Sequence, residues 1–450
     1  MAEIIRLRKG LDIKLLGNPS CEVIQSESSD TYALCPPDFT GVTPKLAVKE
    51  QQMVKAGEAL FIDKNHPEVK FVSPVSGEVL AVNRGAHRKV LSIVVKPDAK
   101  QKHVEFKTKS VQSLSGDEVK SHLMESGLFG FFRQRPYDII ANPDDTPRGI
   151  FVSAFDTNPL APDFEIVLKG NELDFQTGLS ALAKIAPTTL SISASQTAQA
   201  LTQVNNVDLY VFKGPHPAGN VGVQINRIRP VNKGEVVWTM APEAVIFIGR
   251  LFNKGIVDLT RIIAVAGEEI VNPTYLRIMS GARISTIVKG RLKRKDHIRI
   301  INGNVLTGVK ASEDDYLGSF ANMITVIPEG DDVNEFMGWI APRFKQYSVS
   351  RTFFSWLSCS KKRFSIDARI KGGTRHIIMS NEYDKVFPMD IYPEYLIKAI
   401  ITGNIDKMEA YGIYEVAPED FALCEFVDSS KLELQRIVRE GLDNLRAEMA

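Results

Sequence analysis

The stretch FIDKNHPEVKFVSPVSGEV, residues 61–79, decides the fold of the N-terminal part of the chain. Its apolar start ends at Asp63-Lys64, a loop follows, and the turn sequence SPVSG is predicted to open a second strand. The preceding LAVKEQQMVKAGEALF places Gly57 between two short apolar segments, where a tight turn joins two strands. Short strands separated by turn residues predict a small β-sandwich or barrel over residues 38–98.

The hairpin around Lys64 resembles that of lipoyl and biotinyl carrier domains. Such domains carry their prosthetic group on a lysine at the tip of a tight hairpin. Here ten residues, Asn65 to Pro74, lead from Lys64 to the proline, and His66-Pro67 further restricts the loop. This is more than a tight turn needs, so we expect Lys64 to be an unmodified surface lysine.

Length and composition indicate an ordinary globular protein of several domains. A chain of 450 residues is too long for one hydrophobic core. The 55 Lys and Arg residues nearly cancel the 54 Asp and Glu residues, which argues against bulk nucleic-acid binding. No apolar run approaches the ~18 residues of a membrane span. The N-terminal MAEIIRLRKG has no apolar core for a secretory signal, so a cytosolic protein is expected.

The cysteine and histidine spacings give no metal motif. None of Cys21, Cys35, Cys359 and Cys424 forms a CxxC pair, so zinc ribbons, thioredoxin chemistry and four-cysteine iron–sulfur motifs are unsupported. We expect buried thiols rather than disulfides in a cytosolic chain. The histidines form no HExxH or HxxxH pair.

Four segments of different character follow one another. Residues 1–100 form an N-terminal segment with the carrier-like β domain, and residues 96–116 are a polar, lysine-rich linker. Residues 117–256 form an α/β domain, residues 257–330 a compact β-rich module, and residues 331–450 a mostly helical C-terminal region.

The α/β domain is predicted from alternating apolar strands and amphipathic helices. Strands are expected at 149–155, 188–194, 207–214 and 235–240, and helices at 116–127, 171–185 and 242–252. On the helix at 171–185, the residues expected to face inward are Leu173, Leu179, Leu182 and Ile185. This order implies a doubly wound, Rossmann-like sheet.

Beyond residue 257, short apolar runs predict strands at 261–270, 283–290, 297–304 and 322–330. The C-terminal region contains one basic segment and one acidic segment. Residues 343–376 hold nine basic side chains against the single acid Asp367, whereas residues 405–450 hold eleven acids against five bases. A helix is expected at the C-terminus, with Ser430 and Glu433 as its capping box.

The loop GPHPAGNVG, residues 214–222, follows a predicted strand as a nucleotide-binding loop would. However, Asn220 stands where a phosphate-binding loop needs lysine, and the two prolines remove backbone donors. A rigid connection at the carboxyl edge of the sheet is the favoured interpretation. A ligand-binding loop, with His216 among its residues, is the alternative.

The stretch GLFGFFRQRPYD, residues 127–138, concentrates aromatic rings and arginines. Aromatic rings can stack on a flat ligand while arginines donate to its carbonyls, so a quinone or a flavin would suit it. The candidate residues are Phe129, Phe131, Phe132, Arg133, Arg135 and Tyr137. A hydrophobic anchor between domains, or a partner-binding surface, is the alternative.

Two further stretches are candidates for binding. Asp156 and Asn158 follow the first buried strand, where α/β proteins place their sites, although such residues are also common loop formers. The basic cluster from Lys289 to His297 is expected on a hairpin. A solvated face is its usual role, and an acidic partner or anionic lipid headgroups are alternatives.

Taken in order, four stretches closely resemble the A subunit, or alpha subunit, of the Na+-translocating NADH:quinone reductase. They are RKGLDIKLLGNP (8–19), the carrier-like sequence of residues 48–95, VSAFDTNPLAPD (152–163) and FKGPHPAGNVGVQI (212–225). The resemblance covers nearly the whole chain. It implies a carrier-like barrel-sandwich domain, a Rossmann-like domain, a ubiquitin-like β-grasp module of the SLBB type and a helical C-terminal region.

The resemblance also implies a function. The family supplies a peripheral subunit on the cytoplasmic side of the bacterial inner membrane, in a complex with five other subunits, B to F. That complex oxidises NADH, reduces quinone and pumps sodium. The carrier-like fold bears no lipoyl or biotin group in this family. NADH, flavin and iron–sulfur sites are expected on other subunits, and the family's late Cys-x3-Cys is here Cys424-x3-Asp428.

The resemblance therefore implies two roles for this chain, assembly of the complex and a contribution to quinone binding. No catalytic residue is expected in this chain. The expected quinone-binding residues are those of the aromatic–arginine stretch together with His216. Alanine at both Arg133 and Arg135 is expected to weaken quinone binding. A soluble NADH-dependent flavoprotein and a lipoyl-type carrier are the alternatives; the first predicts flavin absorbance and the second a mass increase on Lys64.

Overall fold

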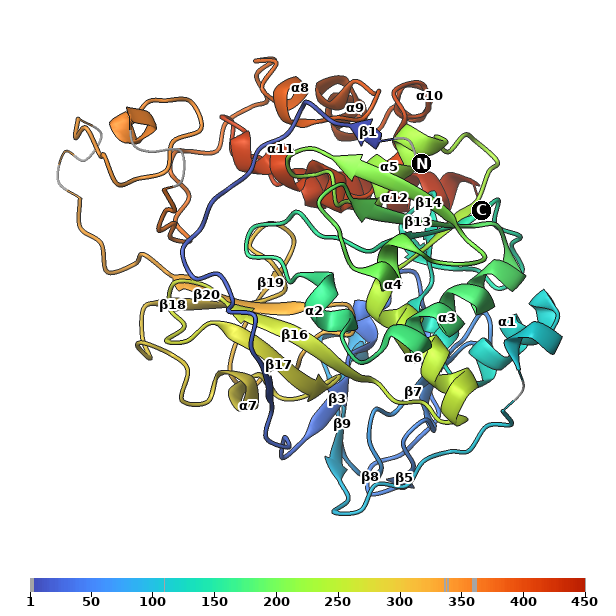
Figure 1. Cartoon of the computed structure of the whole chain (residues 1–450). Coiled ribbons are helices and arrows are strands. Elements are labelled where there is room, and N and C mark those ends of the chain that lie inside the picture. Colours follow the sequence, from blue (N-terminus) through green and yellow to red (C-terminus); the bar gives the residue numbers. More distant parts are fainter. Residues whose placement is uncertain (1–3, 109, 336, 338–339, 358–361, 450) are drawn as a thin grey trace.

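Seven strands form the central sheet of the computed structural model, in the order β1-β14-β13-β12-β15-β10-β11 (Figure 1). The structure describes every residue except 1–3, 109, 336, 338–339, 358–361 and 450. The strands of this sheet are β1 (Ile4–Arg6), β10 (Arg133–Arg135), β11 (Ile139–Ile140), β12 (Ile150–Ser153), β13 (Thr188–Ser193), β14 (Asp208–Lys213) and β15 (Val237–Met240). Strands β1, β14, β13, β12 and β15 run parallel, and β10 is antiparallel to β15.

Helices cover both faces of this sheet. They are α1 (Gly116–Glu125), α2 (Phe164–Leu168), α3 (Glu172–Ile185), α4 (Gln199–Thr202), α5 (Val221–Ile228) and α6 (Pro242–Lys254). Side chains alternate along β12: Ile150 and Val152 belong to the main core, whereas Phe151 packs with Ile225 of α5. The doubly wound α/β fold predicted from the sequence is therefore present.

The chain turns back between β14 and β15. It proceeds outward from β12 through β13 to β14, and then returns through α5 to place β15 on the other side of β12. The carboxyl ends of β12 and β15 lie side by side at this switch point. Open α/β sheets bind their ligands in the crevice outside the strand ends at such a point.

The carrier-like domain consists of two small sheets. One contains β3 (Tyr32–Leu34), β9 (Val90–Pro97), β8 (Gly77–Arg84) and β5 (Met53–Val54), and the other β4 (Pro44–Leu46), β6 (Ala59–Asp63) and β7 (Lys70–Val72). The rings of Phe61 and Phe71 stack at 4.4 Å between centroids, with Phe39 edge-on to Phe71 at 4.5 Å. These three rings form an aromatic core between short strands.

The β-rich module is a mixed sheet of six strands. Their order is β19 (Val309–Ala311), β18 (Ile298–Asn302), β20 (Met323–Pro328), β16 (Thr260–Ala266), β17 (Thr274–Met279) and β2 (Val23–Gln25). The run at 283–290 was expected as a strand, but it forms helix α7 (Ile284–Val288). Ile284 and Ile287 are both buried there, so one helix face completes the core in place of a strand.

The N-terminal segment does not belong to the carrier-like domain alone. Strand β1 pairs in parallel with β14 of the central sheet, and β2 pairs in parallel with β17 of the β-rich module. Only from β3 onward does the chain build the barrel-sandwich. The first 25 residues therefore connect all three domains.

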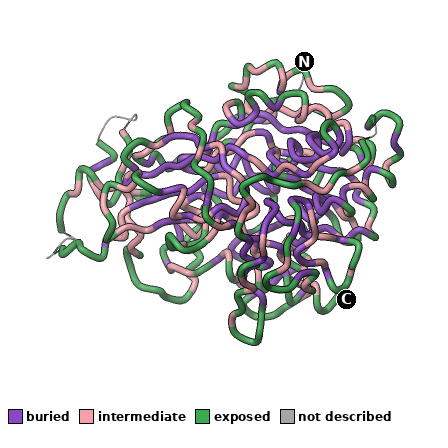
Figure 2. The backbone as a smooth tube through the Cα atoms, turned by 90° about the horizontal axis from the view of Figure 1, so that it is seen from below, coloured by how far each residue is buried: buried purple, intermediate pink, exposed green. Residues whose placement is uncertain are grey.

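The C-terminal helices are α8 (Tyr383–Val386), α9 (Pro393–Ile401), α10 (Ile405–Ala410), α11 (Ala422–Val427) and α12 (Leu434–Met449). They begin only at Tyr383, so the helical region is shorter than the 331–450 expected from sequence. Figure 2 shows buried backbone in the interior of the molecule and exposed backbone at its periphery. Much of the described chain that directly precedes α8 is exposed.

Three local expectations were wrong. Leu173 lies in the first turn of α3 with 74% of its surface exposed, so it does not face inward. The Ser430 hydroxyl donates to the carbonyl of His376 (3.0 Å) instead of capping a helix, and α12 starts at Leu434. Among the cysteines, Cys424 is buried as expected, Cys35 is partly buried and Cys21 is exposed, while Cys359 lies outside the described residues.

Candidate ligand-binding cavity

A cavity of about 230 Å³ lies where β12 and β15 end. The loop after β12 contributes Asp156 and Asn158, and the start of α6 contributes Glu243. The loop before α5 contributes Gly219 and Asn220. Because the carboxyl ends of parallel strands share one edge, residues distant in sequence meet here. The prediction that Asp156, Asn158 and loop 214–222 lie at this edge is confirmed.

The aromatic–arginine stretch divides between core and cavity. Phe129 and Phe132 are fully buried and pack on the ring of Trp238, with centroids 5.5 and 5.2 Å away. They are core residues and do not line the cavity. Phe131 and the two arginines do line it, together with Phe320 of the β-rich module, so the cavity walls come from two domains.

The side chain of Arg135 is hydrogen-bonded to residues of the C-terminal region. Its guanidinium donates to the carboxylates of Asp420 (2.8 Å) and Glu419 (3.0 Å) and to the carbonyl of Glu415 (2.8 Å). Burial alone would lower the pKa of Arg135, but the two carboxylates outweigh burial and raise it. Arg135 therefore fastens β10 to the C-terminal region, and three hydrogen bonds within the chain already engage its guanidinium.

Arg133 is placed differently. Its guanidinium lies over the ring of Phe320, 5.1 Å from the centroid, and forms an ion pair with Asp138 at 3.6 Å. About one third of its side chain is exposed. Its Nε has no hydrogen-bond partner among the described residues. A guanidinium has five N–H donors, so Arg133 can bind a further acceptor in the cavity.

Tyr137 faces a second, smaller cavity of about 160 Å³. This cavity lies between the α/β domain and the carrier-like domain, and Asp63 and His66 also line it. Tyr137 therefore does not share a site with Arg133, and the structure separates two residues that the sequence placed in one candidate stretch.

His216 is buried beside the first cavity rather than in its wall. Its Nδ1 lies 3.2 Å from the hydroxyl of Thr157, which also accepts from the N–H of Gly219 at 2.9 Å. Burial lowers the pKa of His216 to about 4, although Asp156 and Asp12 oppose the shift. The imidazole is neutral at physiological pH and holds the loop after β12 against the loop before α5.

The buried imidazole predicts a stability loss in mild acid. Its pKa is about 6.5 in the unfolded chain and lower in the folded chain, so the unfolded state binds the proton first. The stabilising contribution is complete above pH ~6.5 and is lost as the pH falls toward ~4, by up to about 3 kcal/mol. Urea unfolding at several pH values should show this slope.

His216→Gln removes the titrating group, so the variant should lose less stability between neutral and mildly acidic pH than the unaltered chain. The exposed His87 provides the matched control. His87→Gln should keep the full slope. An equal slope in all three proteins would contradict the assignment.

Acidic groups in the cavity were missed by the sequence reasoning. Glu243 is buried in the first turn of α6, and burial raises its pKa. Burial and the neighbouring Asp420 raise the pKa of Glu419 to about 7. Glu243 follows β15 directly, so the rule that found Asp156 could have found it. Glu419 comes from the distant C-terminal region, and no local pattern signals it.

Lys64 opens the six-residue loop between β6 and β7. Its side chain is exposed, and its backbone N–H donates to the carbonyl of Thr43 at 2.8 Å. Asp63 shapes the loop, because its carboxylate accepts from the N–H groups of Thr43 and Asn65. Lys64 therefore does not occupy the tip of a tight two-residue turn.

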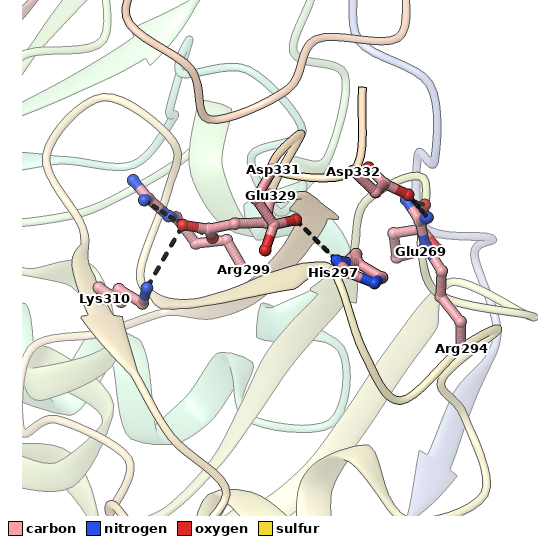
Figure 3. A network of polar contacts seen from close by, with 8 residues as sticks. All are labelled: Glu269, Arg294, His297, Arg299, Lys310, Glu329, Asp331 and Asp332. Carbon is pink, nitrogen blue, oxygen red and sulfur yellow. Dashed lines mark hydrogen bonds and ion pairs between the residues drawn. The ribbon is translucent and has the colours of Figure 1, made fainter. Parts of the chain in front are cut away.

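The basic cluster at 289–297 lies in the loop from α7 to β18, and acids pair with three of its members. Figure 3 shows two of them, Arg294 and His297. Lys289 pairs with Glu27 at 2.8 Å, and Arg294 pairs with Glu269 at 2.9 Å. His297 pairs with Asp331 at 2.9 Å, and Asp332 lies nearby and pairs with Arg294. These three exposed side chains, His297, Asp331 and Asp332, could hold a metal ion, but ion pairs already engage them.

Within the described part of the chain, no helix is both long enough and apolar enough to cross a bilayer.

The fold and the cavity define a multidomain α/β protein with a cavity at the switch point of a doubly wound sheet, flanked by β modules. Three models of one family match: the NqrA N-terminal barrel-sandwich hybrid domain at residues 5–98, the NqrA second alpha/beta domain at 114–257, and the NQRA C-terminal domain at 262–313. The chain belongs to the NqrA family, the A subunits of the Na+-translocating NADH-quinone reductase, and is thus part of that membrane respiratory complex.

Curated relatives align along the whole chain. The A subunits of the reductase from Neisseria meningitidis serogroup B (strain ATCC BAA-335 / MC58) and Haemophilus influenzae (strain PittGG) are each 36% identical over 450 residues, covering 99% of this chain and 100% of the relative. That of Pasteurella multocida (strain Pm70) is 34% identical over 449 residues, with the same coverage.

Among solved structures, an NAD+-reducing [NiFe]-hydrogenase in the H2-reduced state aligns with a TM-score of 0.37 and 13% identity. The alignment covers 75% of this chain and 62% of the hydrogenase chain.

Proposed function

We propose that this chain contributes a quinone-binding pocket to the Na+-translocating NADH-quinone reductase, in the cavity at the ends of β12 and β15. It also serves assembly, as a peripheral subunit on the cytoplasmic side of the inner membrane beside the five other subunits, B to F. NADH oxidation, flavins and iron–sulfur centres belong to those other subunits in this proposal. The observation that carries it is the meeting of Phe131, Arg133 and loop 214–222 in one cavity.

The lining suits a flat, uncharged ring. Phe131, Phe155, Phe164 and Phe320 provide aromatic walls. A quinone offers carbonyl acceptors and no strong donor, so its site needs donors. The Nε of Arg133 has no hydrogen-bond partner among the described residues, so Arg133 can supply such a donor.

The same lining disfavours a dinucleotide. Asp138 and Asp156 place carboxylate groups in the cavity, and Arg135 is neutralised by its own partners. An anionic pyrophosphate entering this cavity would meet like charge without a glycine-rich backbone cradle. This charge pattern supports a neutral quinone over NADH.

The test is equilibrium dialysis of the purified chain with a short-chain, water-soluble quinone. Arg133→Ala should weaken binding by roughly 10- to 100-fold, because a hydrogen bond from a charged donor contributes about 1.5–3 kcal/mol. Arg133 is replaced alone, since loss of Arg135 would strand buried Asp420. Arg229→Ala, at a mostly exposed arginine outside the cavity lining, is the matched control and should bind normally.

NADH is titrated in parallel. Saturable quinone binding without NADH binding supports an acceptor site in this chain. Equal quinone affinity of the Arg133→Ala and Arg229→Ala proteins would refute the assignment. NADH binding with flavin absorbance would instead favour a flavoprotein, and a mass increase on Lys64 a carrier.

A further inference from the structure

Residues 340–357 and 362–376, here called the basic arm, extend from the body of the molecule (Figure 1, orange). The arm is fastened at its base. The N–H of Phe364 donates to the carbonyl of Lys14 (2.8 Å), and the N–H of Leu16 donates to the carbonyl of Phe364 (3.0 Å). The ring of Tyr347 packs against Phe426 with centroids 5.9 Å apart. The remainder of the arm is largely exposed (Figure 2).

The charge of the basic arm is strongly one-sided. It holds eight lysines and arginines and a single acid, Asp367, in a chain whose overall charge is only +1. Asp367 is already paired with Arg369 at 2.7 Å. No ion pair engages Lys345, Arg351 or Arg375 among the residues that the structure describes. The arm therefore presents uncompensated positive charge that a partner outside the chain can neutralise.

Large apolar side chains are exposed among these cations. Phe344, Phe354 and Trp356 are each about half exposed, and Leu357 is 62% exposed. The guanidinium of Arg351 lies 5.7 Å from the ring centroid of Trp356, so a cation and an aromatic ring share one surface. Tryptophan with lysine and arginine is the composition found where proteins contact the headgroup region of a bilayer.

We infer that the basic arm lies on an anionic lipid bilayer. The chain belongs to a membrane complex, and its described helices include none that could span a membrane. An anionic leaflet supplies the negative charge that the arm lacks, and its interface accepts single apolar side chains without a shaped groove. In the other basic cluster, at 289–297, Lys289, Arg294 and His297 are paired with acids of the chain, and the cluster exposes no large aromatic ring. This inference does not depend on the quinone proposal.

The test is co-sedimentation of the full-length chain with vesicles. Phosphatidylcholine vesicles containing about one third phosphatidylglycerol should bind the chain and release it at high salt, whereas pure phosphatidylcholine vesicles should bind it weakly. Lys345→Glu/Arg351→Glu should lower the partition coefficient by about tenfold or more. Trp356→Ser/Leu357→Ser should lower it about tenfold without a change of charge.

A matched control reverses the same number of charges elsewhere. Lys293→Glu/Lys295→Glu alters two exposed lysines of the other basic cluster and should change binding by less than about threefold. All substituted side chains are exposed or lack buried partners, and an unchanged circular dichroism melt shows that the fold is intact.

Three results would overturn the inference: no binding to the anionic vesicles, equal loss in the arm and control variants, or binding that ignores lipid charge. The chain could instead fail to bind vesicles and yet require the arm to join the membrane-embedded part of the complex in lipid-free detergent. That result would identify the arm as a protein interface.

Discussion

Replacing Arg135 with methionine is expected to lower the free energy of unfolding by about 3–5 kcal/mol. The side chains of Arg135 and Asp420 are 2% and 0% exposed, and their ion pair is 2.8 Å long. Methionine removes the positive charge and leaves Asp420 buried without its counter-ion. Urea unfolding followed by circular dichroism gives the change in free energy.

A double-mutant cycle separates the pair from general damage. Asp420→Asn in the Arg135→Met background removes the stranded charge but keeps an acceptor for the N–H of Ala417. The double variant should be more stable than the sum of the two single effects predicts, by roughly 1–3 kcal/mol. Arg436→Met, at an exposed ion pair, should leave the unfolding midpoint unchanged. Simple additivity would show that the buried pair is not coupled.

Substitutions where α3 crosses α6 should lower the stability of the protein nearly as much. A Cβ at Gly249 would lie 1.7 Å from the carbonyl oxygen of Asp174, and one at Gly178 would lie 2.1 Å from that of Val245. Each alanine therefore forces the helices apart. Overpacking costs about 1–3 kcal/mol at each site, against about 1 kcal/mol gained in helix propensity. The double variant Gly178→Ala/Gly249→Ala should show a clearly lowered unfolding midpoint and poor yield.

Gly373 serves as the control for this prediction, because a Cβ there meets no atom within 4 Å. Gly373→Ala should unfold at the same urea concentration as the unaltered chain. If the double variant at the helix crossing were equally stable, the close approach of α3 and α6 would not be what the two glycines secure.

Periodicity predicted most elements of the fold, and tertiary context decided the exceptions. The strands β12, β13 and β15 are largely buried, and for β12 a continuous apolar run identified the strand. The run RISTIV is rich in β-branched residues, which favour strands, yet it forms α7 because the module needs a short buried helix there. At α12, Asp428 accepts from the N–H groups of Ser430 and Leu432, and this local turn delays the helix.

The candidate site could be predicted in part. Asp156, Asn158 and loop 214–222 follow strands, so the position of strand ends was enough to place them. Within the aromatic–arginine stretch, the sequence could not tell core rings from cavity walls, because both are phenylalanines one to three positions apart. Phe320 and Glu419 reach the cavity from other domains, and only the assembled structure brings them there.

The N-terminal segment has a consequence for synthesis on the ribosome. Ile4 of β1 is opposite Val211, and Val23 of β2 is opposite Tyr275. Both strands can therefore pair only after the ribosome has added more than two hundred further residues. At about 5–20 residues per second, that delay is on the order of 10–50 s. The barrel-sandwich can fold during this time, while β1 and β2 remain exposed to chaperones. The strands β1 and β2 are thus among the last elements of the fold to be paired.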